Sequence, residues 1–154
     1  MLKLYKPTLF QLDYRQKLLA DSATMAYNEP WGGTIDFSRD RWESWASRWL
    51  QSDENAFFYR YLQREDGSFV GEAAWRYDEL EGCHMLSIIV ESCHRRCGYG
   101  RQALRLLEQA AQEAGIGAVC DHISHGSAAI DLFLQEGYTK RKEDADGILL
   151  YKEL

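Results

Sequence analysis

Residues 88–101, Ile88-Ile89-Val90-Glu91-Ser92-Cys93-His94-Arg95-Arg96-Cys97-Gly98-Tyr99-Gly100-Arg101, connect a hydrophobic strand to a helix. The glycines fall at the turn, and the residues that follow carry apolar side chains at helical spacing. The first amides of a helix have no partner within the helix, and the helix dipole places partial positive charge there. Glycines let the backbone approach a bound group closely. The stretch therefore predicts an anion site suited to phosphate or pyrophosphate.

Arg95, Arg96 and Arg101 add three positive charges around this turn. The pattern is not a Walker loop, because no Lys-Ser or Lys-Thr pair follows the second glycine. It is not a Rossmann fingerprint either, because Ala103 stands where the third glycine would fall. The alternative to an anion site is a tight strand-to-helix connection with exposed arginines.

The spacing Arg95-x-x-Gly98-x-Gly100 after a strand resembles the signature of the GCN5-related N-acetyltransferases, the GNAT superfamily. In that family the signature reads Gln or Arg, two residues, Gly, one residue, then Gly or Ala. A second family pattern, Asn-x-x-Ala-x-x-Leu-Tyr-x-x-x-Gly-Phe, is matched here by Gly126-x-x-Ala129-x-x-Leu132-Phe133-x-x-x-Gly137-Tyr138. The second match departs from the family at Gly126 and Phe133.

The composition is that of an ordinary globular protein. The chain has 154 residues, 45% of them hydrophobic, and residues 1–154 are expected to form one domain. Its net charge of −6 leaves no basic excess for nucleic acid. The sequence contains no signal-peptide pattern and no apolar run long enough to span a membrane, so we expect a cytoplasmic protein without nucleic-acid or membrane partners.

Cysteines and histidines raise the question of a metal. In a cytoplasmic protein the four cysteines, Cys83, Cys93, Cys97 and Cys120, are expected to be reduced thiols. No Cys-x-x-Cys pair is present, and neighbours on a strand such as Cys83 and His84 point to opposite faces. We therefore expect no metal site.

The order of expected elements also resembles the GNAT fold. Strands are expected at 2–6, 56–64, 69–77, 83–90, 118–122, 138–142 and 148–152, and helices at 8–26, 38–50, 102–114 and 126–136. Trp42, Trp45 and Trp49 recur at helical spacing and are expected in the core. The resemblance implies an α/β (α+β) fold class: a mixed, mostly antiparallel sheet of about seven strands flanked by four helices, with a splayed cofactor cleft between strands 4 and 5.

The resemblance implies that the cofactor is acetyl-CoA. It implies that the backbone of Ile88, Ile89 and Val90 binds the pantetheine arm. The residues that it assigns to the pyrophosphate turn are Arg95, Arg96, Cys97, Gly98, Tyr99, Gly100 and Arg101. Phe133 stands where the family often has a tyrosine that protonates the departing thiolate, and it can only pack against the pantetheine. Gly126 lacks the side chain of the family's Asn.

Amine attack on a thioester needs a base to remove the amine proton. Asp121 matches the place where some relatives carry a Glu, and His84 shares strand parity with Val90. Glu72 is a weaker candidate base and a candidate substrate contact, whereas His94, His122 and His125 are expected to be solvated. Tyr27 and Trp31, in a turn-rich segment, are either walls of a substrate pocket or loop anchors.

The resemblance thus implies an acetyl-CoA-dependent N-acetyltransferase that modifies a primary amine of a small molecule or peptide by direct attack. Two alternatives stay open. One is a GNAT-fold module that binds CoA or acyl-CoA with little or no turnover, and the other is transfer of a longer acyl group. A homodimer is possible.

Overall fold

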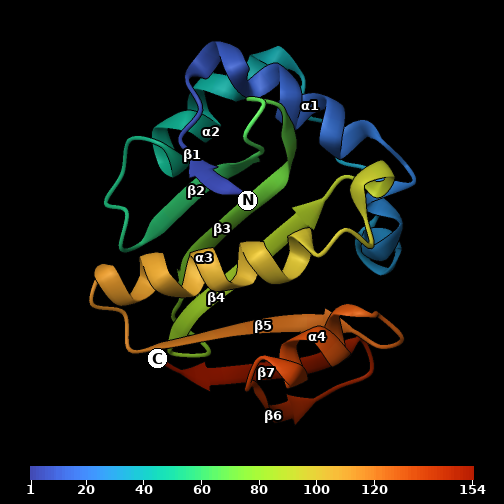
Figure 1. Cartoon of the computed structure of the whole chain (residues 1–154), viewed down its shortest axis with the longest axis vertical. Helices are drawn as coiled ribbons and strands as arrows, with labels where there is room; N and C mark the ends of the chain where they lie inside the picture. The colour runs from blue at the N-terminus through green and yellow to red at the C-terminus, as the bar shows by residue number, and fades with distance from the viewer.

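A seven-stranded mixed sheet forms the centre of the computed structural model, which describes residues 1–154 (Figure 1). In the order in which they lie side by side, the strands are β1 (Lys3–Tyr5), β2 (Phe57–Gln63), β3 (Phe69–Asp78), β4 (Cys83–Val90), β5 (Ala118–Ser124), β7 (Gly147–Glu153) and β6 (Thr139–Glu143). Neighbouring strands are antiparallel except β4 and β5, which are parallel. The predicted fold class is confirmed.

The helices pack on both faces of the sheet. They are α1 (Leu12–Ala20), α2 (Trp42–Trp49), α3 (Tyr99–Glu113) and α4 (Ala129–Gln135), with short 3₁₀ helices at Leu9–Gln11, Thr24–Trp31, Arg39–Arg41 and Ser92–His94. Leu104, Leu107 and Phe133, from α3 and α4, join a core of 17 buried residues on one face. Leu18 and Trp42, from α1 and α2, join a core of 12 on the other. No helix is long and apolar enough to cross a bilayer.

Two expected helix boundaries were wrong. The first helix ends at Ala20, because Asp21 is extended, and the chain then forms the 3₁₀ helix Thr24–Trp31. Tyr27 and Trp31 therefore lie on a short helix and not in an irregular loop. Helix α4 begins at Ala129, because Gly126 has φ +81°, outside the helical region. Trp42 is buried as expected, and Trp45 and Trp49 pack against the same core.

Strands β4 and β5 separate soon after they meet. Only two positions are in register, His84 with Val119 and Met85 with Cys120. Beyond these positions β4 and β5 are no longer paired with each other. Their carboxyl-terminal halves stay paired on their other edges, β4 with β3 and β5 with β7. The sheet therefore splits between its fourth and fifth strands, as the family resemblance implied.

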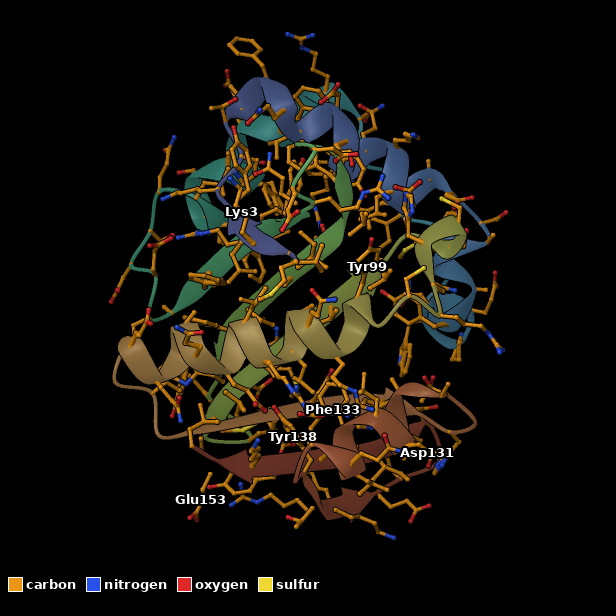
Figure 2. All side chains as sticks on the ribbon, in the orientation of Figure 1. Lys3, Tyr99, Asp131, Phe133, Tyr138 and Glu153 are labelled. Carbon is orange, nitrogen blue, oxygen red and sulfur yellow. A yellow bond between two sulfur atoms is a disulfide. The ribbon has the colours of Figure 1, made fainter.

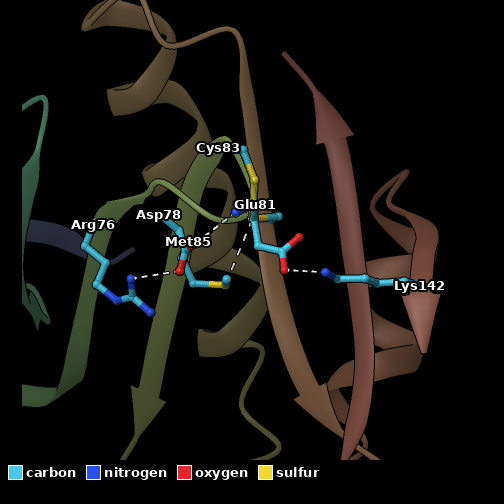
Figure 3. The surroundings of a disulfide bond; sticks show 7 residues. Arg76, Asp78, Glu81, Cys83, Met85 and Lys142 are labelled. Carbon is cyan, nitrogen blue, oxygen red and sulfur yellow. Dashed lines mark hydrogen bonds and ion pairs between the residues drawn. A yellow bond between two sulfur atoms is a disulfide. The ribbon is translucent and has the colours of Figure 1, made fainter. Parts of the chain in front are cut away.

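A disulfide joins the two strands at the closed end of this split (Figure 3). Cys83 on β4 and Cys120 on β5 are bonded, with Cα atoms 6.5 Å apart, and both are buried. The sulfur of Met85 lies 4.0 Å from that of Cys120. The expectation of four reduced thiols was therefore wrong for this pair, because the parallel register that brings the two residues together is not visible in the sequence. Cys93 and Cys97 are free and exposed.

The disulfide should contribute measurably to stability. Its residues are 37 positions apart, and closing a loop of that length lowers the entropy of the unfolded chain by an amount worth about 4 kcal/mol. We expect the double variant Cys83→Ser, Cys120→Ser to lose roughly this much unfolding free energy in urea titrations without reductant. The double variant Cys93→Ser, Cys97→Ser is the control and should match the wild type. A wild type whose stability is the same with and without reductant would contradict the prediction.

Candidate functional site

The turn before α3 presents a row of unpaired backbone amides. Gly98 (φ +79°) and Arg96 (φ 63°) are both in the left-handed region, which turns the chain sharply into the helix. The backbone N–H groups of residues 96–101 donate to no acceptor in the chain, and no side chain caps the start of α3. The backbone arrangement of an anion site is therefore present.

The arginine side chains near the turn are mostly engaged elsewhere. Arg95 donates from Nε to the carbonyl of Val90 (3.1 Å) and from Nη2 to the carbonyl of Thr24 (2.7 Å). Arg101 forms an ion pair with Glu136 at the end of α4. Arg95 and Arg101 therefore carry their charges beside the turn, but their guanidinium groups are held by groups of the chain itself. Arg96 is exposed and forms no ion pair, so its guanidinium is free to meet an anion.

A cavity of about 860 Å³ occupies the split between β4 and β5. Its lining includes most of the predicted site residues: Ile88, Ile89, Val90, Arg95, Gly100, Asp121, Phe133, Tyr27 and Trp31. The other residues predicted for the pyrophosphate belong to the turn beside the cavity and do not line it: Arg96, Cys97, Gly98, Tyr99 and Arg101. The structure thus brings segments from five elements to one cleft.

The cleft passes from one face of the sheet to the other. On the α3 face it is lined by Gly100, Leu132 and Phe133, and Figure 2 shows Phe133 near Tyr138 on the side of α4 that faces α3. On the opposite face it is lined by Tyr27 and Trp31, which are 40% and 46% exposed. One ligand can therefore reach the split from the amide turn while another enters between the aromatic side chains.

Asp121 is the only carboxylate in the cleft lining. Burial raises the pKa of Asp121 well above its ordinary value. No lysine or arginine forms an ion pair with it, whereas Glu54, Glu81 and Glu136 each pair with one. A carboxyl group whose pKa moves toward neutrality can accept a proton from an amine.

His84 does not reach the cleft. Its Nε2 lies 2.8 Å from the carbonyl oxygen of Asn55, and its ring packs edge-on against Trp75 and Tyr77. Burial lowers the pKa of His84. His84 and Val90 lie on the same face of β4, as their even spacing predicts. Six residues along a strand separate them by about 20 Å, however, so His84 lies far from the cleft at Val90. The interpretation of His84 as a base in the cleft was wrong.

Glu72 is buried beside the cleft and not within its lining. Arg15 donates from Nη1 to both carboxylate oxygens (2.7 and 2.5 Å), and the hydroxyl of Tyr59 donates to Oε2. The carboxylate of Glu72 is thus fully engaged, which removes it as a candidate base. It lines a smaller adjoining pocket together with Arg15 and Tyr59.

His122 is a cleft residue that the sequence interpretation missed. Its ring lies 6.1 Å from that of Trp31 in an edge-on arrangement, and its Nε2 is 3.2 Å from Oδ2 of Asp144. It was expected to be solvated, yet it lines the cleft on β5 next to Asp121. Its position directly after Asp121, on a strand expected to line the cleft, could have predicted that His122 lies there.

The site thus combines a split between two parallel strands with a turn of unpaired backbone amides at one end, an arrangement that can bind a phosphate-bearing group. Residues 17–138 match the acetyltransferase (GNAT) family, and the chain therefore belongs to that family. No curated protein matches the sequence.

Several solved structures share the fold. Spermidine N-acetyltransferase from Vibrio cholerae, in complex with CoA and spermine, has a TM-score of 0.82 at 16% identity, covering 99% of this chain and 95% of that one. Phosphinothricin acetyltransferase from Sinorhizobium meliloti, in complex with acetyl-CoA, has a TM-score of 0.78 at 15% identity, covering 99% and 88%. Ribosomal-protein-alanine N-acetyltransferase from Brucella melitensis has a TM-score of 0.77 at 21% identity, covering 99% of both chains.

Proposed function

We propose that this protein is an acetyl-CoA-dependent N-acetyltransferase that modifies a primary amine of a small molecule or peptide. One observation carries the proposal: the unpaired amides of residues 96–101 stand at the mouth of a cleft that crosses the sheet. Membership of the GNAT family and the CoA or acetyl-CoA bound in similar structures support the same activity.

The residues of the cleft fit CoA. The amides of residues 96–101 suit its pyrophosphate, with the free guanidinium of Arg96 nearby. The edge of β4 from Ile88 to Val90 has no strand partner on the β5 side and can hydrogen-bond a pantetheine arm as a neighbouring strand would. When bound, acetyl-CoA supplies an acetyl group whose carbon–sulfur bond breaks as the carbon–nitrogen bond forms.

Asp121 is our candidate for the base. An alkylammonium ion must lose a proton before its nitrogen can attack, and the raised pKa of Asp121 makes the carboxylate a better acceptor near neutral pH. Its negative charge also attracts the ammonium form into the cleft. Tyr27, Trp31 and His122 surround the entrance on that side and are candidates for contacts with the acceptor.

Neither Phe133 on α4 nor Tyr138 after it can protonate the departing thiolate. Phe133 has no such group, and the hydroxyl of Tyr138 donates to Glu108 at 2.8 Å within the core. Since a thiolate is a tolerable leaving group near neutral pH, turnover does not require an acid there.

The proposal is tested by thiol release from acetyl-CoA across a panel of primary amines, together with calorimetry of CoA binding. We expect CoA to bind and at least one amine to accelerate thiol release. CoA binding without turnover of any amine would favour a binding module, and the absence of CoA binding would contradict both functions.

Restoring a hydroxyl on α4 should raise turnover. In the variant Phe133→Tyr the new group would lie at the edge of the cleft, where it can protonate the thiolate as CoA departs. We expect kcat to rise about tenfold, which is less than the roughly 10²- to 10⁴-fold rate increase that a well-positioned general acid usually gives. The variant Phe58→Tyr, at a buried position outside the cleft, is the control. An unchanged kcat in a folded Phe133→Tyr variant would show that departure of the thiolate is not slow.

A further inference from the structure

A second cavity of about 210 Å³ adjoins the cleft between the sheet and α2. The two cavities share four lining residues, Arg76, Met85, Leu86 and Ser87. The rest of its lining consists of Arg15, Trp45, Trp49, Tyr59, Glu72, Ala74 and Trp75. We call this space the side pocket. Its position on the face of Tyr27 and Trp31 connects it to the proposed entrance for the acceptor.

Each charged side chain that lines the side pocket has an ionic partner, and Arg76 is paired with Asp78 at 3.0 Å. Arg15 and Glu72 form an ion pair in which Nη1 contacts both carboxylate oxygens. The guanidinium of Arg15 also lies over three aromatic rings, two of which line the side pocket: its Cζ is 4.5 Å from the centre of Trp45 and 5.3 Å from that of Tyr59. Aromatic faces can bind a ligand cation, but here a protein cation already occupies them, and a second would be repelled. The side pocket therefore suits an uncharged, flat, apolar group.

The main cleft is also unsuited to a ligand with several positive charges. Its lining contains one carboxylate, Asp121, and two arginines, Arg76 and Arg95. This balance holds although the whole chain has a net charge of −6. One ammonium group can be matched by Asp121, and each additional one would meet no free carboxylate in the cleft.

Ser87 marks the passage between the two cavities. It is exposed although it lies in the middle of β4, because both cavities open at this point. It is two residues from Ile89, a distance of about 7 Å along the strand. A short carbon chain can therefore connect an amine in the cleft to a ring in the side pocket.

We propose that the acceptor is a monoamine that carries an aromatic group on a short carbon chain. The aromatic group binds in the side pocket, and the amine lies at Asp121. This inference rests on the proposed acetyltransferase function and adds the substrate class: an arylalkylamine and not a polyamine.

The first test compares tryptamine and phenethylamine with spermidine and putrescine as acceptors. Burial of one aromatic ring should raise kcat/KM for the arylalkylamines by about 100-fold over the polyamines. Equal or better use of spermidine would overturn the inference while leaving the acetyltransferase function in place.

The second test measures binding and does not depend on turnover. Tryptamine is titrated by calorimetry into the CoA-loaded protein, its variant Ser87→Ile and the control Thr139→Ile, which changes an exposed strand position outside both cavities. Ser87→Ile should weaken tryptamine binding by about 30-fold or more, by closing the passage, and Thr139→Ile should bind as the wild type does. Ala74→Met, which fills the side pocket from β3, should act like Ser87→Ile.

The outcomes separate the two proposals. Tryptamine binding that both pocket variants weaken, without turnover of any amine, would support the side pocket and contradict the acetyltransferase function. Tryptamine binding that neither folded variant weakens, or no tryptamine binding by the wild type, would overturn the inference. Circular dichroism and thermal melting show whether each variant folds. If one of the two pocket variants does not fold, tryptamine binding by the other pocket variant decides between these outcomes.

Discussion

Replacing Gly98 with aspartate should weaken CoA binding by about 100-fold or more. The new carboxylate would stand at the start of α3, among the amides that we assign to the pyrophosphate. Two unit charges about 4 Å apart near a protein surface repel by roughly 4 kcal/mol, and each 1.4 kcal/mol is a factor of ten in affinity. The effect is therefore expected to be large even after partial screening by salt.

The matched control is Gly98→Asn, which adds nearly the same atoms without the charge. A Cβ at Gly98 would meet no atom within 4 Å, so both side chains have room. Both must also adopt φ +79°, which Asn and Asp tolerate better than most residues. Calorimetry of CoA with the two variants isolates the charge. Equal affinities in the two variants would count against a diphosphate at this turn.

Replacing Asp121 with asparagine should lower kcat/KM for the amine by about 10²- to 10⁴-fold, the usual contribution of a positioned base. CoA affinity should change little, because the carboxylate faces the acceptor in our account. In the wild type, kcat/KM should fall as the pH drops through the raised pKa of Asp121, and the variant should lack this dependence. Asp131→Asn, at an exposed position on α4, is the control.

The same substitution should stabilise the protein at neutral pH. Because the pKa of Asp121 is higher in the folded than in the unfolded protein, the folded state binds more protons between the two values. Ionised Asp121 therefore costs stability at every pH above its unfolded pKa, most fully above its folded pKa. Asp121→Asn should melt above the wild type at pH 7, with a smaller difference near pH 4. A full loss of activity with no pH-dependent gain in melting temperature would mean that the carboxylate is not desolvated.

Local sequence patterns were sufficient to predict the strand, turn and helix at the centre of the site. The strand before Val90, the glycine turn and the apolar face of α3 each follow from neighbouring residues, and the structure has all three. The divergence of β4 and β5 followed from the family resemblance. The structure confirms it, because β4 and β5 are paired at only two positions, His84 with Val119 and Met85 with Cys120.

Features that depend on distance across the fold could not be predicted. The bond between Cys83 and Cys120 requires the parallel register, and the position of His84 requires the length of β4. The contact between Trp31 and His122 joins segments that are far apart in the sequence. The engagement of Glu72 by Arg15 likewise depends on how α1 packs on the sheet. Periodicity gives the face of a residue but not its neighbours on another element.

The central claim is that backbone amides at the start of α3 bind a diphosphate, and amide chemical shifts test it most directly. We expect CoA, titrated into ¹⁵N-labelled protein, to cause its largest amide shifts at residues 96–101, because these N–H groups gain acceptors. Pantetheine, which lacks the diphosphate, should leave them nearly unchanged while shifting residues 88–90. If CoA saturates the protein while the amides of 96–101 stay at their free positions, the account of this site is wrong.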